Sequence, residues 1–114
     1  MESCIFCRIR DDELPARKVY EDELVVAFED LNPQAPTHVL VIPRRHIATL
    51  NDLQPDDEPL VGHMLAVGAK MAAQRGHAAR GWRAVFNNQR EAGQTVFHIH
   101  LHVLGGRPME WPPG

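Results

Sequence analysis

Residues 96–104 read Val96-Phe97-His98-Ile99-His100-Leu101-His102-Val103-Leu104, and this stretch decides the fold. Histidine alternates with apolar residues along it. Because successive side chains of a strand point to opposite faces, the pattern predicts a strand with His98, His100 and His102 on one face. The other face is predicted to be core and holds Phe97, Ile99, Leu101 and Val103. Each imidazole has two polar nitrogens that need partners where water is excluded, so three in a row predict a site for a ligand, a metal or an anion.

The rest of the chain reads as short strands and one long helix. Strands are predicted over 18–20, 24–29, 37–42 and 82–87, in addition to 96–104. A short helical turn is predicted over 5–10 and a long helix over about 55–75, where Leu60, Met64, Val67 and Met71 recur at intervals of four, three and four residues. Gly76 is expected to close that helix. We therefore predict an α+β fold, with an antiparallel sheet covered by helix, in one domain over residues 1–114.

Composition narrows the class of protein. The formal net charge of −3 argues against a nucleic-acid binder, which needs a basic stripe to follow the phosphate backbone. There is no run of 18 apolar residues, and the start Met1-Glu2-Ser3-Cys4 carries an acid where a secretory signal carries bases. We expect a cytoplasmic protein with no membrane partner.

Cys4 and Cys7 are spaced as Cys-x-x-Cys. A reducing compartment disfavours a structural disulfide, which leaves a redox pair or half of a metal site. A thioredoxin-type pair needs a preceding strand, but only three residues precede Cys4, so zinc is favoured. A closed zinc site needs four ligands. Among the histidines at strand ends or on the 96–104 run, we choose His46 and His98 as the other two.

Three ordered blocks resemble the histidine triad (HIT) family over essentially the whole chain. They are Phe28-Glu29-Asp30-Leu31-Asn32-Pro33-Gln34-Ala35-Pro36-Thr37-His38, then Val41-Ile42-Pro43-Arg44-Arg45-His46, then residues 93–107 with the three histidines. The closing Trp111-Pro112-Pro113-Gly114 is similar to the Hint branch of nucleotide-binding members. The resemblance implies a HIT-like homodimer in which two five-stranded sheets join, each subunit having one long and one short helix.

The resemblance further implies a hydrolase that cleaves the P–N bond of purine nucleoside 5′-phosphoramidates through an adenylylated histidine. His100 matches the nucleophile, His102 a phosphate contact, Thr95 the proton donor to the departing amine, and His38 a residue behind His100 that orients it. Nucleotide contacts are implied for Asp30, Leu31, Asn87, Gly93, Gln94, Thr95, His100, His102 and Trp111. The backbone amides at 93–95 are expected to cradle the phosphate. Bacterial members with the cysteines imply structural zinc on Cys4, Cys7, His46 and His98, with no cofactor needed for catalysis.

Alternatives remain open at this point. Asn87 stands where the branch that cleaves dinucleoside polyphosphates (Fhit-like) tends to have glutamine, so that activity ranks second. A nucleotide-binding interaction module with incidental turnover, and a metallohydrolase using the triad as ligands, are further possibilities. Trp111 is either an anchor in the partner's pocket or a local plug. His63 and His77 are predicted to face solvent.

Overall fold

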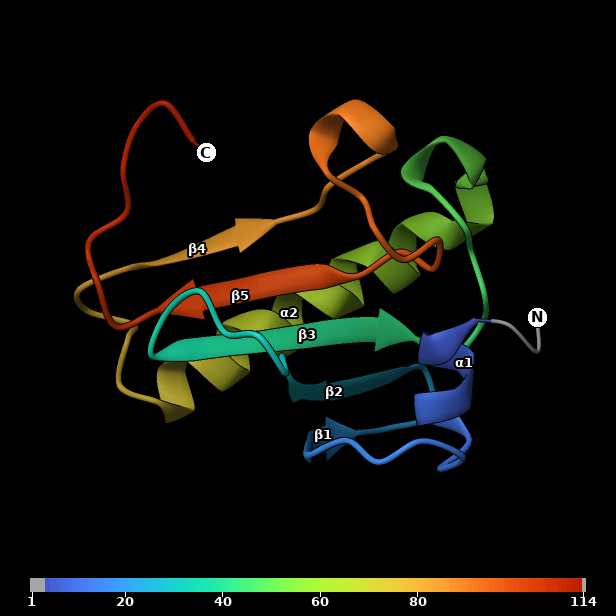
Figure 1. Ribbon diagram of the computed structural model, residues 1–114, viewed down its shortest axis with the longest axis horizontal. Coiled ribbons are helices and arrows are strands. Elements are labelled where there is room, and N and C mark those ends of the chain that lie inside the picture. The colour runs from blue at the N-terminus through green and yellow to red at the C-terminus, as the bar shows by residue number, and fades with distance from the viewer. Residues whose placement is uncertain (1–3, 114) are drawn as a thin grey trace.

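The computed structural model describes residues 4–113, whose strands form one antiparallel sheet in the order β1-β2-β3-β5-β4 (Figure 1). The strands are β1 (Lys18–Glu21), β2 (Val25–Glu29), β3 (Thr37–Pro43), β4 (Trp82–Val85) and β5 (Leu101–Gly105). The helices are the short α1 (Ile5–Arg10) and the long α2 (Glu58–Gln74), with 3-10 turns at Leu50–Asp52, Pro55–Asp57 and Arg90–Ala92. This confirms the predicted five-stranded α+β fold. Residues 1–3, from which no secretory signal was expected, and Gly114 of the closing Trp-Pro-Pro-Gly lie outside the described residues.

β3 is buried along its whole length, because an apolar layer covers each face of the sheet. Along β3, Val39 and Val41 pack in the layer under α2, whereas Leu40 and Ile42 pack in the layer that contains Phe6 of α1. In Figure 1, α2 runs behind the sheet and α1 lies in front of one end of it. The strand period of two thus separates a structural face from the face that α1 leaves partly open.

The long helix begins as predicted, with a 3-10 turn at Pro55–Asp57 that continues into α2. Met64, Val67 and Met71 of the predicted apolar stripe are buried, and Leu60 packs against them. Gly76 follows the helix end with φ +84°, a conformation that favours glycine. Neither α2 nor any other helix in the described part of the chain is long and apolar enough to cross a membrane.

The predicted strand over 96–104 is wrong in its first half, because β5 begins only at Leu101. The residues before it pair with the loop after β3 instead of with a strand. The Gln94 side-chain amide donates to the Ala48 carbonyl at 2.7 Å, and the Ile99 N–H donates to the Ile47 carbonyl at 2.7 Å. The predicted strand over 82–87 is likewise shorter and ends at position 85.

Side-chain alternation nevertheless persists through this irregular segment. Ile99 packs in the α2 layer, while the rings of His98 and His100 lie against Phe6 at centroid distances of 6.1 and 5.0 Å. Phe97 departs from the prediction, since it is 45% exposed and not part of the core. His98 and His100 thus keep the predicted face, although residues 96–98 form bends and the strand begins only at Leu101.

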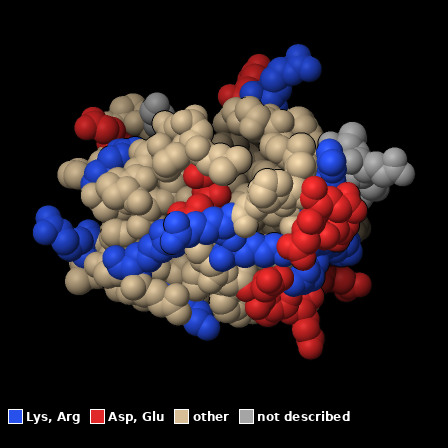
Figure 2. Space-filling model, turned by 60° about the horizontal axis from the view of Figure 1, so that its bottom comes forward, with Lys and Arg blue, Asp and Glu red and all other residues tan. Residues whose placement is uncertain are grey.

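Charged side chains gather beside the edge strand β1. Lys18 Nζ lies 2.8 Å from Asp12 and 3.6 Å from Glu21, and Arg44 lies 2.9 Å from the same glutamate. Figure 2 shows Lys and Arg as a band across this side of the molecule, with Asp and Glu next to it. Such an edge disfavours pairing with another strand.

The histidines predicted to face solvent are both half-buried and paired, so that prediction is wrong. His63 Nε2 lies 2.6 Å from the carboxylate of Asp22, and His77 Nε2 lies 2.8 Å from the Thr37 hydroxyl. The His77 ring also packs against Gly105, where an added Cβ would lie 2.7 Å from it. His63 thus connects α2 to the turn between β1 and β2, and His77 connects the segment after α2 to β3.

Candidate active site and metal centre

A pocket of about 230 Å³ opens on the α1 face of the sheet, and we name it the histidine pocket. Its apolar wall comes from α1 and from strands β2 and β3, and its polar end carries His100 and His102. The residues that line it are Ile5, Phe6, Ile9, Ala16, Phe28, Glu29, Asp30, Leu31, Leu40, Thr95, Val96, His100 and His102. The pocket therefore joins an apolar cleft to a cluster of imidazoles and one aspartate.

His100 is held as a neutral imidazole with one free nitrogen. Its Nδ1–H donates to the backbone carbonyl of His98 at 2.8 Å, which leaves the lone pair on Nε2. The ring is only 6% exposed, and burial lowers the pKa of His100 below the ordinary histidine value. The edge-on ring of Phe6 fixes its other side, with an interplanar angle of 87°. A neutral imidazole fixed in this tautomer is suited to nucleophilic attack.

His102 is held in the opposite tautomer by a chain of hydrogen bonds. The Gln34 backbone N–H donates to Nδ1 of His38 at 3.0 Å, so the proton of that neutral ring is on Nε2. His38 Nε2–H then donates to Nδ1 of His102 at 2.8 Å, which leaves a hydrogen on His102 Nε2. Burial lowers the pKa of His38, and lowers that of His102 to about 4, so both rings are neutral.

The Nε2 atom of His102 is buried without a hydrogen-bond partner among the described residues. A buried donor with no acceptor is costly, so such an atom commonly marks where a ligand atom binds. His38 was expected behind His100, but it contacts His102, and the carbonyl of His98 orients His100 instead. His100 is thus fixed with Nε2 as an acceptor, and His102 is fixed with Nε2–H as a donor.

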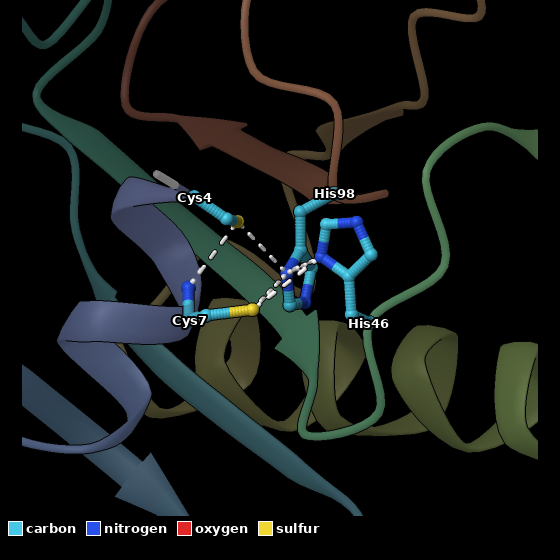
Figure 3. Close-up of side chains that lie close together, drawn as sticks. All are labelled: Cys4, Cys7, His46 and His98. Atoms are coloured by element: carbon cyan, nitrogen blue, oxygen red, sulfur yellow. Dashed lines mark hydrogen bonds between the residues drawn. The ribbon is translucent and has the colours of Figure 1, made fainter. Parts of the chain in front are cut away.

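Four side chains converge beside this pocket and form what we name the cysteine–histidine cluster: Cys4, Cys7, His46 and His98. Figure 3 shows all four pointing toward one another, with the cysteines on or next to α1. Their ligand atoms lie within 4.8 Å of one another. Sulfur–Nδ1 distances are 3.4 Å for Cys4–His98, 3.4 Å for Cys7–His46 and 3.5 Å for Cys7–His98, and the two Nδ1 atoms are 3.2 Å apart.

These distances fit a tetrahedral zinc ion. Zinc bonds of about 2.3 Å to sulfur and about 2.0–2.1 Å to nitrogen separate S from N by about 3.5 Å and two N atoms by about 3.3 Å. The Nε2–H of His98 donates to the Pro43 carbonyl at 2.8 Å, which leaves Nδ1 free to act as a ligand. Burial lowers the pKa of His98 to about 4, so its ring is neutral. The predicted four residues are thus brought together.

Interatomic distances also argue against a metal ion bound by the triad. Asp30, His38 and His102 also come within 4.8 Å of one another, but the 2.8 Å between the two imidazole nitrogens is a hydrogen-bond distance and short for two ligands of one ion. His100 belongs to neither cluster. The three triad histidines therefore have three separate environments.

The loop before the triad differs from its expected role as a phosphate cradle. The Gly93 N–H donates to the Arg90 carbonyl at 3.0 Å and the Gln94 N–H donates to the Gln89 carbonyl at 3.1 Å, so neither amide is free. The buried Gln94 side chain accepts from the Gln89 N–H at 2.8 Å and holds the loop. Of the three predicted residues, only Thr95 lines the histidine pocket.

Asp30 and Leu31 are placed at the pocket as expected, while Asn87 and Trp111 do not line it. One oxygen of Asp30 accepts from the Asn32 N–H at 2.8 Å, and the other lies 3.4 Å from His38 Nε2. Trp111 is 82% exposed, which contradicts its alternative role as a local plug.

Sequence reasoning missed the wall that α1 contributes. Ile5, Phe6 and Ile9 line the pocket, and the two latter residues are buried in the apolar layer on that face. Ile5 and Ile9 are four residues apart and Phe6 and Ile9 are three apart, so on a helix they share one face, and this spacing could have identified them. The Cys-x-x-Cys pattern indicates only that this helix carries metal ligands.

Comparisons with known proteins agree with this geometry. A sequence model of the family described as "Scavenger mRNA decapping enzyme C-term binding" matches residues 3–111. The chain is 49% identical over 108 residues to the purine nucleoside phosphoramidase of Escherichia coli K12, covering 95% of this chain and 91% of that protein.

Solved structures give the same assignment. A HIT family hydrolase from Legionella pneumophila superposes with a TM-score of 0.96 and 51% identity, covering 98% of this chain and all of that one. A Zn-bound histidine triad family protein from Mycobacterium smegmatis gives a TM-score of 0.80 and 39% identity, covering 93% and 76%. The chain therefore belongs to the histidine triad (HIT) family of hydrolases.

Proposed function

We propose that this chain hydrolyses the P–N bond of purine nucleoside 5′-phosphoramidates through a nucleotidyl group carried transiently by His100. One observation carries the proposal: the free Nε2 lone pair of His100 and the unpartnered Nε2–H of His102 belong to residues that line one pocket. A lone pair beside a preorganised donor suits attack on a phosphorus whose oxygens are negative. The 49% identity to a purine nucleoside phosphoramidase supports the same activity.

The apolar part of the histidine pocket suits a purine. Phe6 and Phe28 lie edge to face at 5.4 Å and offer an aromatic wall, and Leu31, 88% exposed, stands at the rim. An ionised carboxylate has about four acceptor sites, so the contacts that Asp30 already makes leave room for two ribose hydroxyls. This places the 5′-phosphate at the imidazole end.

In the first step, Nε2 of His100 attacks the α-phosphorus, and the new N–P bond forms as the P–N bond to the amine breaks. The electron pair passes to the departing nitrogen, which takes a proton from the Thr95 hydroxyl; this exposed hydroxyl regains one from water. His102 Nε2–H donates to a phosphate oxygen. The hydrogen bond from His100 Nδ1 to His98 stabilises the charge that the imidazole gains.

In the second step, water attacks the same phosphorus. A P–O bond forms, the P–N bond to His100 breaks, and its electron pair returns to Nε2. The water releases one proton to solvent, which balances the proton consumed in the first step. The products are the free amine and AMP or GMP.

Zinc would be held by Cys4, Cys7, His46 and His98 and would act as a structural ion, because four protein ligands leave no position open for substrate. The two cysteines come from or adjoin α1 and the histidines come from the sheet side, so the cluster fastens the pocket wall to the triad segment. No step of the reaction passes through these residues.

We further propose that the protein is a cytoplasmic homodimer with small purine nucleotides as its only other partners. β4 is an edge of the sheet, paired on one side by β5. Arg83 of β4 donates to the carbonyl of Glu110 at 2.8 Å, and the next residue, Trp111, is 82% exposed. A second subunit would cover both. Light scattering in solution, with Trp111→Ala as the variant, tests this assembly.

Two other activities are less well supported. Cleavage of dinucleoside polyphosphates uses the same nucleophile, but Asn87, expected to mark the difference, does not line the pocket. A binding module with incidental turnover would not need two histidines fixed in complementary tautomers. A His100→Ala variant separates the binding module from either hydrolase, because only a binding module keeps its cellular effect.

The direct test is to trap the intermediate. The protein is mixed with a fluorogenic adenosine 5′-phosphoramidate, quenched rapidly in denaturant and analysed by peptide mass spectrometry. We expect one AMP on the peptide that contains His100. His100→Ala should lose both the adduct and turnover, whereas the control His63→Ala should retain them. Absence of any adduct, together with parental turnover in His100→Ala, would refute the proposal.

A further inference from the structure

A second hollow of about 410 Å³, which we name the Phe97 groove, adjoins the histidine pocket. Ile5, Thr95 and Val96 line both hollows, so the two are immediate neighbours. The histidine pocket alone, at about 230 Å³, is smaller than the range of about 300–1,000 Å³ typical of ligand sites. A substrate made of two parts would fill both hollows.

Thr95 stands at the junction, and the proposed reaction puts the departing nitrogen beside its hydroxyl. Displacement at phosphorus is in line, so the leaving group departs on the side opposite to the attacking atom. Because Thr95 lines both hollows, a group attached to a nitrogen beside its hydroxyl can extend into the Phe97 groove. The nucleoside and the amine therefore occupy different hollows.

The described lining of the groove combines polar and apolar side chains and carries no formal charge. Apart from the shared residues, its lining consists of Ala48, Phe97 and the cluster residues Cys4 and His46. Of the residues that the structure describes, those lining the groove include no Lys, Arg, Asp or Glu. Phe97, 45% exposed, offers a planar apolar surface without a role in the core.

We propose that the Phe97 groove binds the organic part of the departing amine and selects uncharged, apolar amines over amines that carry a carboxylate, a phosphate or a second ammonium group. The inference rests on the proposed function and names the substrate class within it. A charged leaving group would find no ion-pair partner among the lining residues and would be partly desolvated. An apolar group would instead cover Phe97 and Val96.

The test uses the His100→Ala protein, which binds amides without turning them over. Calorimetry measures the Kd of two adenosine 5′-phosphoramidates, one of 2-phenylethylamine and one of β-alanine, with AMP as the reference. We expect the phenylethyl amide to bind roughly tenfold more tightly than the carboxylate amide. Phe97→Ala should reduce that ratio at least threefold, and Phe97→Leu should preserve most of it. Leu65→Ala, which removes a similarly exposed side chain from α2, is the matched control.

The same ratio is measured in the wild-type protein as kcat/KM, so the test does not depend on the His100 variant being folded. Equal affinities for the two amides, or a ratio that Phe97→Ala leaves unchanged, would overturn the groove assignment while leaving the adduct on His100 intact. A missing adduct together with parental turnover in His100→Ala would instead refute the proposed function, and the binding ratio would still report on the groove.

Discussion

Two glycines of α2 provide a stability prediction with an internal control. Gly62 and Gly68 are both inside the helix, but they face different surroundings. A Cβ added at Gly62 would meet nothing within 4 Å, whereas one added at Gly68 would lie 2.9 Å from Cδ2 of Leu101 and 3.1 Å from Cγ2 of Val103. Both neighbours are fully buried side chains of β5. The same substitution should therefore have opposite effects at the two positions.

The magnitudes follow from two terms. Alanine is favoured over glycine in a helix interior by about 0.8–1.0 kcal/mol, and both variants gain this. Overpacking a filled core costs about 1–3 kcal/mol, and only Gly68→Ala incurs it. Gly62→Ala should raise the free energy of unfolding by about 1 kcal/mol, and with it Tm by about 4 °C. Gly68→Ala should be between neutral and about 2 kcal/mol less stable than the parent.

Urea denaturation of both variants and the parent, with equal protein concentration and metal content, measures the two changes. The difference between the variants cancels helix propensity and isolates the packing of α2 on β5. Equal stabilisation by both substitutions would refute the reasoning, because Leu101 would then move aside at no cost. Leu101→Val combined with Gly68→Ala should recover part of the loss by removing the atoms in closest contact.

Three further results are expected. Because burial lowers the pKa of His100 and attack needs its neutral form, kcat/KM should be constant above the ordinary histidine value of 6.5 and fall only at lower pH; an inflection above 6.5 would contradict this. A chelator should lower the unfolding free energy by several kcal/mol and reduce turnover only slowly, whereas immediate loss of turnover in a folded, AMP-binding protein would point to a catalytic metal. His38→Ala should free the tautomer of His102 and lower kcat/KM about tenfold, as one lost hydrogen bond predicts; an unchanged ¹⁵N spectrum of the His102 ring would argue against the relay.

Much of the fold was predictable because its strongest signals are local. The stripe of Met64, Val67 and Met71 needs only the helical period, and Pro33 and Pro36 disfavour a strand between β2 and β3. The irregular start of the 96–104 run was not predictable in this way. Residues 96–98 form bends, and whether a segment with alternating side chains joins a sheet depends on a partner that is distant in the sequence. Here the partner is the loop at Ile47 and Ala48.

In the site, too, the features set by local sequence were predicted and those set by tertiary contacts were not. The Cys-x-x-Cys pair and the alternating histidines were predicted from residue type and short spacing. His46 and His98 were chosen as histidines at a strand end or on the 96–104 run, and the distances confirm that they converge with the two cysteines. The role of His38 was not predicted correctly. Whether His38 contacts His100 or His102 depends on the register of β3 against β5, in which His38 pairs with Leu104. The number of backbone amides available to bind phosphate at 93–95 was also not predictable from local sequence. A glycine-rich loop offers amides only if its own turns do not use them, and those of Gly93 and Gln94 are used.

His98 connects the two halves of the site through three different atoms. Its Nδ1 faces the cysteine sulfurs, its Nε2–H is fixed by the Pro43 carbonyl, and its own carbonyl holds Nδ1–H of His100. His98 and His100 precede β5, so no strand pairing fixes them, and the N–H of Ile99 between them is bonded to the loop that carries His46. The tautomer of the nucleophile therefore depends on the position of a residue of the metal cluster. A structural ion at that cluster would act on the reaction by fixing the carbonyl that orients His100, without contacting substrate.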